Sequence, residues 1–147
     1  MLCLPKVPQY HAEASTDNPN KAELFVAEYQ VSGGSQHLRG HHNHNAPCAV
    51  CEVSTRSKHL MIPALYDWPA GWTEEYDGWL VAERTNHVNH KGRITYMCLD
   101  KNPDVLPGLY ANTDGVLLQH VEVTCNYGVP CPPYDDRKEL SCVVCTK

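Results

Sequence analysis

The segment GHHNHNAPCAVCEV, residues 40–53, places three histidines and two cysteines between His41 and Cys51. Imidazole nitrogens and thiolates are zinc ligands, whereas imidazole and amide groups together can hydrogen-bond a hydroxyl-rich ligand. If this segment were extended, His42 and His44 would lie on one face. Three interpretations follow: a zinc site, a sugar-contact loop beside structural cysteines, or an exposed polar turn.

The two Cys-x-x-Cys pairs do not have the spacing of a zinc ribbon. Cys48 with Cys51 and Cys142 with Cys145 could supply four thiolates, but the pairs are separated by far more than the roughly 15 to 20 residues of that motif. Each pair also lies in an apolar run typical of a strand, whereas redox-active dithiols open a helix. We therefore expect structural cysteines, and a histidine-based zinc or copper site stays as an alternative.

Eight cysteines in 147 residues predict a disulfide framework. Because such frameworks form in oxidising compartments, we expect a secreted, extracellular protein. The sequence leaves the pairing open. The cysteines expected to be bridged are Cys3, Cys48, Cys51, Cys98, Cys125, Cys131, Cys142 and Cys145.

Two parts of the chain resemble each other at a nearly constant offset. MLCLPKVP at residues 1–8 matches YMCLDKNP at 96–103, and PCAVC at 47–51 matches SCVVC at 141–145. A duplicated unit explains both matches. We predict one domain, residues 1–147, with related halves 1–54 and 55–147. Three cysteines lie in the first half and five in the second, so complete bridging would require a disulfide between the halves.

The hydrophobic pattern is that of strands rather than helices. Short runs rich in β-branched and aromatic residues are separated by turn residues, among them 11 prolines and 9 glycines. We predict a mostly β fold, a small disulfide-rich domain of short antiparallel strands. The runs are ELFVAEYQV (23–31), HLMIP (59–63), GWLVAER (78–84), RITYMCL (93–99), VLLQHVEVTC (116–125) and ELSCVVC (139–145).

Composition excludes several classes of function. With 12 basic and 17 acidic residues the net charge is -5, so no basic surface for nucleic acid is expected. The apolar runs are far shorter than the roughly 20 residues of a membrane span. The chain has no Gly-x-Ser-x-Gly, no His-Glu-x-x-His and no phosphate-binding loop, so we do not expect an enzyme.

Several motifs together resemble a known family. HNAPCAVCEVSTRSKHLMIPA, GWTEEYDGWLVA, NHKGRITYMCLDKNP and VPCPPYDDRKELSCVVCTK closely resemble the C-terminal non-collagenous domain of invertebrate short-chain collagens. The domain is also similar to marine-invertebrate lectins that bind galactose and N-acetyllactosamine. The resemblance implies a non-catalytic sugar-binding protein.

The chain departs from this family at two turns. Family members usually carry a Cys-Pro-x-Gly turn ahead of the CLP run, and here the chain begins almost on that run, so the first half is expected to be truncated. Trp68 stands where the corresponding turn of the second half commonly has Cys. We therefore expect an altered disulfide pattern. The chain has no Gly-x-y repeat, so it cannot itself form a collagen triple helix.

A galactose site generally combines an aromatic ring for the apolar sugar face with planar hydrogen-bonding groups for the hydroxyls. In the second half Tyr76 and Trp79 are candidate stacking rings. The candidate hydrogen-bonding residues there are Glu83, Asn86, His87, Asn89, His90, Lys91 and Arg93. In the first half the corresponding candidates are Gln36, Arg39, His41, His42, Asn43, His44 and Asn45.

A calcium site is a further candidate. Asp100, Asn102 and Asp104 alternate as at the start of an EF-hand loop, but the loop lacks the glycine, and Ala111 stands where the bidentate Glu belongs. They could bind calcium as a loop of another type.

We therefore expect a secreted lectin that binds terminal galactose-type glycans on glycoproteins or cell surfaces, as a homodimer or larger oligomer. The alternatives are an extracellular matrix or assembly module related to short-chain collagen, and the histidine-based metal-binding protein.

Overall fold

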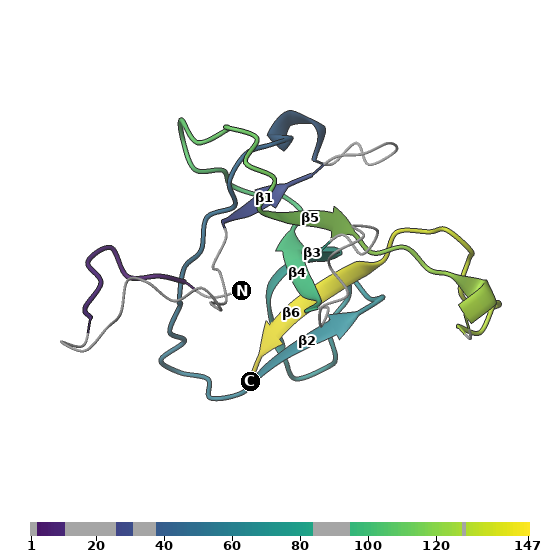
Figure 1. The fold of residues 1–147 in the computed structure, drawn as a ribbon. Helices are drawn as coiled ribbons and strands as arrows, with labels where there is room; N and C mark the ends of the chain where they lie inside the picture. The colour runs from purple at the N-terminus through teal and green to yellow at the C-terminus, as the bar shows by residue number, and fades with distance from the viewer. Residues whose placement is uncertain (1–2, 11–25, 31–37, 84–94, 128) are drawn as a thin grey trace.

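The computed structural model describes residues 3–10, 26–30, 38–83, 95–127 and 129–147. Its regular structure in these ranges consists of strands and two short 3₁₀ helices (Figure 1). The strands are β1 (Ala27–Tyr29), β2 (His59–Pro63), β3 (Thr73–Glu83), β4 (Met97–Asp100), β5 (Val116–His120) and β6 (Ser141–Thr146). The 3₁₀ helices are η1 (Arg39–His41) and η2 (Cys125–Tyr127). The expected mostly β fold is confirmed.

The strands form one mixed sheet with the order β1-β5-β3-β6-β2, and β4 pairs with β3. β3 is the longest strand and pairs with β4, β5 and β6, all antiparallel. The β1–β5 pair is parallel, with Glu28 opposite Leu117, and in this it differs from the expected antiparallel pattern. A parallel pair needs a long connection, and here most of the chain separates the two strands.

The buried residues lie where the sheet is most completely paired. β6 is flanked by β2 and β3, and it buries Cys142, Val143 and Cys145. At the other end of the sheet, Tyr29, Leu38 and Leu118 form a buried apolar cluster. This cluster anchors β1 and the start of η1 to β5, and it brings the first-half histidines into the fold.

The disulfides are Cys3–Cys48, Cys98–Cys142 and Cys125–Cys131. The first two fall at matching positions of the two halves. None of the three joins the halves, because Cys51 and Cys145 are free, whereas all eight cysteines were expected to be bridged. These two free cysteines also occupy matching positions. The boundaries of the halves themselves stay a prediction.

The two Cys-x-x-Cys segments lie in different environments. Cys142 and Cys145 lie in β6, as expected for a strand. Cys48 and Cys51 lie in exposed irregular chain, where the side chain of Val50 is 90% exposed. The strand expected at CAVC is therefore absent. β6 is paired on both sides, whereas no described strand lies beside residues 47–53.

Candidate functional site

The first-half candidates form a compact loop, residues 39–45, which we call the His/Asn loop. η1 opens it, and its second part runs antiparallel to β1. The backbone N–H of Tyr29 donates to His44 O at 3.0 Å, and that of Asn43 donates to Tyr29 O at 2.9 Å. Asn43 has φ of 62°, a left-handed conformation that Asn tolerates better than most residues. The loop thus turns sharply and extends the edge of the sheet.

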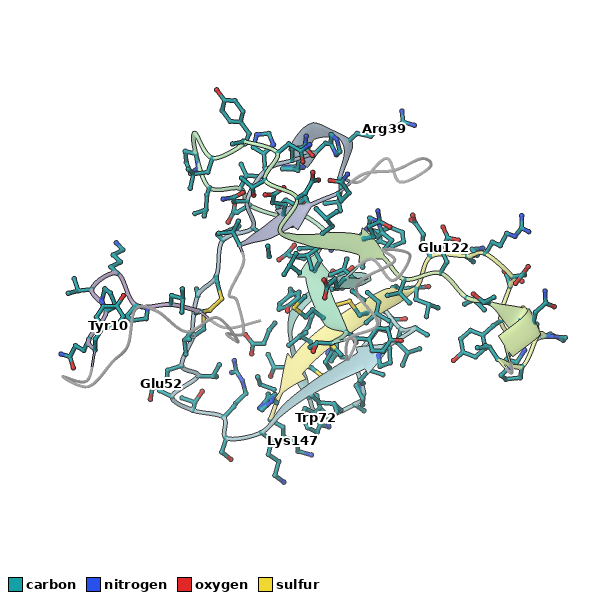
Figure 2. The ribbon with its side chains drawn as sticks, viewed as in Figure 1. Tyr10, Arg39, Glu52, Trp72, Glu122 and Lys147 are labelled. Atoms are coloured by element: carbon teal, nitrogen blue, oxygen red, sulfur yellow. A yellow bond between two sulfur atoms is a disulfide. The ribbon has the colours of Figure 1, made fainter. Side chains whose placement is uncertain are left out.

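A third segment, residues 104–113, closes the other side of the loop. The N–H of Asn45 donates to Leu109 O, and the N–H of Leu106 donates to Asn45 O, each at 3.1 Å. The fold therefore brings together β1, the His/Asn loop and a segment that is distant from both along the chain. Figure 2 shows side chains from these segments crowded together at one end of the molecule, with Arg39 extending away from it.

Aromatic rings form a row across this site. Tyr29 and His41 contact edge to face with centroids 6.1 Å apart, and His41 and His44 lie 6.5 Å apart. His44 is 5.8 Å from the ring of Tyr110, whose side chain is exposed. The row runs from the buried core at Tyr29 to solvent at Tyr110. Tyr110 thus offers an aromatic face beside an imidazole.

Tyr29 anchors the buried end of this row. Its hydroxyl donates to the carbonyl oxygen of Asp104 at 2.9 Å. Burial, and the negative charge of Asp104, raise the pKa of Tyr29 to about 12. The ring is therefore a fixed, neutral part of the core, and it holds segment 104–113 against β1.

Several polar atoms of the site are buried without a hydrogen-bond partner. In the described part of the chain these include Nδ1 of His41 and Oδ1 of both Asn43 and Asn45. Glu28 Oε2 and Gln30 Oε1, in and next to β1, share this property. A buried polar atom left unpaired costs free energy, so a ligand that supplied partners would be favoured here.

The described second-half candidates, Tyr76, Trp79 and Glu83, lie in β3, on another part of the sheet. The hydroxyl of Tyr76 donates to Cys98 O at 3.1 Å, and burial raises its pKa. Trp79 contacts His120 edge to face at 5.6 Å, and Glu83 ends β3. Outside the described residues lie the other second-half candidates, Asn86, His87, Asn89, His90, Lys91 and Arg93, and also Gln36 of the first half. The second-half site therefore stays a prediction.

The expected calcium ligands occupy the end of β4 and the turn after it. The N–H of Asn102 donates to Asp100 Oδ1 at 2.8 Å, and the backbone carbonyl of Asp104 accepts from Tyr29. Within the described ranges no group of three or more His, Cys, Asp or Glu side chains is placed to hold a metal ion. Calcium binding at residues 100–104 stays a prediction.

A separate apolar groove lies between β2, β3 and the chain that follows β5, with a volume of about 740 Å³. Two partly exposed rings, Tyr96 and Tyr134, lie at it. Sequence reasoning missed this groove because its lining comes from strands and turns that are distant along the chain. The lining residues include Met61, Pro63, Leu80, Val121, Glu122, Val123, Val129, Pro130 and Leu140.

Sequence reasoning also missed Glu28 and Tyr110. Tyr110 had a usable signal, since an aromatic residue within GLYANTDG is surrounded by turn residues and is expected to be exposed. Glu28 had none, because an acidic residue in an apolar run is normally assigned to the solvent face of a strand.

Comparison with known proteins gave no match: no family model, no curated protein and no solved structure matches the chain. The resemblance to short-chain collagen domains and lectins therefore stays a prediction. The described residues contain no helix that is both long and apolar enough to cross a membrane. The three disulfides are compatible with an extracellular protein.

Proposed function

We propose that the protein is a secreted, non-catalytic lectin that binds terminal galactose-type glycans at the His/Asn loop. One observation carries the proposal: the exposed ring of Tyr110 lies beside His44, in the same small site as the unpartnered polar atoms of His41, Asn43 and Asn45. The sequence resemblance to galactose-binding lectins supports the choice of sugar.

The chemistry of galactose suits such a site. One face of the ring is a continuous C–H surface, which packs against an aromatic side chain such as Tyr110. The hydroxyls at the edge of the sugar both donate and accept, and imidazole and amide groups can pair with either role. A single site of this kind binds weakly, and an oligomer with several sites would gain avidity on a cell surface.

The first experiment is a glycan array on the oxidised protein, with calcium and again with chelator. Selective binding to β-galactosides is expected, and loss of binding with chelator would add a metal to the site. An array blank under both conditions would reject the lectin proposal.

The site itself is tested by calorimetry with N-acetyllactosamine on the variants Tyr110→Ala and Tyr66→Ala. Both side chains are similarly exposed, at 64% and 65%, so removing either one has little effect on the core. We expect Tyr110→Ala to weaken binding about tenfold or more, because a stacked ring and its buried area are lost. We expect Tyr66→Ala to bind like the wild type. Equal affinities for all three proteins would place the sugar elsewhere.

The apolar groove favours the second candidate function, a matrix or assembly module. An exposed groove lined mainly by apolar side chains fits protein better than sugar, which needs a higher share of hydrogen-bonding groups. This function predicts association that is independent of sugar. Sedimentation of the wild type with and without lactose, beside the variant Tyr134→Asp in the groove, separates the two candidates. Association lost only in Tyr134→Asp would favour the module, and association reversed by lactose would favour the lectin.

A further inference from the structure

β1 has one apolar face and one polar face. Ala27 and Tyr29 belong to the face that packs with the Leu38 and Leu118 cluster. Side chains alternate along a strand, so Glu28 lies on the opposite face. Glu28 is nevertheless fully buried, with 0% of its surface exposed. A buried carboxylate requires compensation by a cation or by several hydrogen bonds.

Among the described residues, only one of the two carboxylate oxygens of Glu28 has hydrogen-bond partners. Oε1 accepts from the hydroxyl of Thr113 and from the Thr113 backbone N–H, the latter at 3.2 Å. Oε2 accepts no hydrogen bond. No lysine, arginine or histidine of the described residues forms an ion pair with Glu28. The described residues therefore compensate the charge of this carboxylate only in part.

Two residues with amide side chains, Asn45 and Gln30, are placed next to Glu28 by the backbone pairing. Asn45 lies directly opposite Glu28 in an antiparallel bridge. The flanking hydrogen bonds join Ala46 N to Ala27 O and Tyr29 N to His44 O, which is the arrangement in which facing side chains come closest. Gln30 lies two residues beyond Glu28, and its backbone N–H still bonds Leu118 O in the parallel register, so it shares the face of Glu28.

Every unpartnered atom of this group is an acceptor. They are Glu28 Oε2, Gln30 Oε1, Asn43 Oδ1 and Asn45 Oδ1, and Asn43 and Asn45 are two residues apart in the segment that faces β1. One water molecule donates only two hydrogen bonds, so it cannot satisfy four acceptors. A cation can satisfy all of them and also neutralise the carboxylate.

We propose that these four side chains bind a calcium ion between β1 and the His/Asn loop. Calcium takes six to eight oxygen ligands and accepts Asn and Gln carbonyls with water in the remaining positions, whereas magnesium requires near-ideal octahedral geometry and retains its water. Zinc prefers nitrogen and sulfur ligands. With a single carboxylate the affinity is expected in the range of extracellular modules, about 10⁻⁴ to 10⁻³ M.

This calcium site is distinct from the one expected at Asp100, Asn102 and Asp104. It shares Asn43 and Asn45 with the proposed sugar site, but its effect on stability is measured without a sugar. Its effect is structural, because an ion held by both β1 and the loop fixes the loop against the sheet. An ion that binds the native state but not the unfolded state raises the melting temperature of the protein. The readout therefore requires no glycan.

The test is thermal unfolding and calorimetry of the full, oxidised chain after chelator treatment, with added CaCl₂ or MgCl₂. We expect calcium to raise the melting temperature in a saturable manner, and magnesium to do so more weakly. Glu28→Gln, which keeps the shape and removes the charge, is expected to abolish the calcium effect. Asp104→Asn is the control and is expected to respond like the wild type.

Asn45→Asp provides a second test that does not depend on the folding of Glu28→Gln. A second carboxylate beside Glu28 is expected to lower stability without calcium and to tighten calcium binding about tenfold, since the number of charged ligands sets affinity. Three results would each overturn the proposal: no calcium response up to about 10 mM, an unchanged response in Glu28→Gln, or a response lost in Asp104→Asn. Unaltered calcium affinity in Asn45→Asp would also overturn it.

Discussion

Gly78 in β3 lies so close to β4 that no side chain fits at this position. A Cβ atom placed on Gly78 would lie 1.8 Å from the carbonyl oxygen of Leu99 and 2.8 Å from Lys101 N. These are backbone atoms of β4 and the residue after it, so they cannot rotate away as a side chain could. Gly78→Ala therefore forces β3 and β4 apart by roughly 1 Å or more.

The cost follows from the contacts that this separation breaks. Lys101 N–H donates to Asp77 O at 3.1 Å, and the Tyr76 hydroxyl donates to Cys98 O at 3.1 Å. Each lost bond costs about 1 kcal/mol, and forcing an extra carbon into a packed site costs about 1 to 3 kcal/mol. We expect Gly78→Ala to lower the free energy of unfolding by about 3 to 5 kcal/mol, a large part of a typical total of about 5 to 15 kcal/mol.

Urea unfolding at constant pH measures this change, with Gly40→Ala in η1 as the matched control. A Cβ atom placed on Gly40 would meet no other atom within 4 Å, and the φ of Gly40 is not positive. Its substitution is therefore expected to change stability by no more than about 0.5 kcal/mol. The reasoning would be refuted if Gly78→Ala were as stable as the wild type, or if both substitutions had the same cost.

Three further results are expected. A thiol reagent should titrate one cysteine in the native protein, the exposed Cys51, and two after unfolding without reductant, because Cys145 is 0% exposed and burial raises the pKa of its thiol; two fast thiols in the native state would contradict this. Since the pKa of Tyr29 is raised to about 12, its contribution to stability should be complete below its ordinary pKa of 10.0 and disappear as pH rises through 12. Urea unfolding as a function of pH measures this loss. The Cys145→Ala background removes the buried thiol, whose pKa is also raised, and in it Tyr29→Phe should lose less stability at alkaline pH than the protein that keeps Tyr29; an equal loss in both would contradict the prediction. Replacing Cys98 and Cys142 by alanine should lower the free energy of unfolding by about 4 kcal/mol, and replacing Cys125 and Cys131 should lower it by about 2 kcal/mol. The reason is that the first disulfide spans 44 residues and the second 6. Equal losses of unfolding free energy in urea would argue against loop-closure entropy as the cause.

The strands could be predicted wherever the sequence has a short run of β-branched and apolar residues. HLMIP is β2 with the predicted ends, and ELSCVVC contains most of β6. The first part of β3, TEEYD, was not predicted, because its charged residues have little strand preference. It is a strand because β6 pairs with it, and Glu75 is also held by Arg56 at 2.7 Å and by Thr146. Such long-range pairing is not visible in a local pattern.

The candidate site also has one part that local residue types predict and another part that depends on long-range pairing. The His/Asn loop was predicted as a sugar-contact loop from residue types that hydrogen-bond well, and this stays a prediction. The structure adds that the backbone of the loop is held against β1. Tyr110 and Glu28 depend on the parallel pairing of β1 with β5 and on the return of segment 104–113. No periodicity in the sequence specifies that register, so their place beside the histidines could only come from the fold.

The position of the His/Asn loop has a consequence for solubility. β2, at one end of the sheet, is short and ends at Pro63, two features that discourage edge-to-edge pairing with another chain. β1, at the opposite end, does not end in a proline. Its outer hydrogen-bonding groups are covered by Asn43 and His44 of the loop and by Ala46, the residue after the loop. The segment proposed to recognise a ligand therefore also protects a sheet edge from aggregation, so changes that unfold it would reduce binding and solubility together.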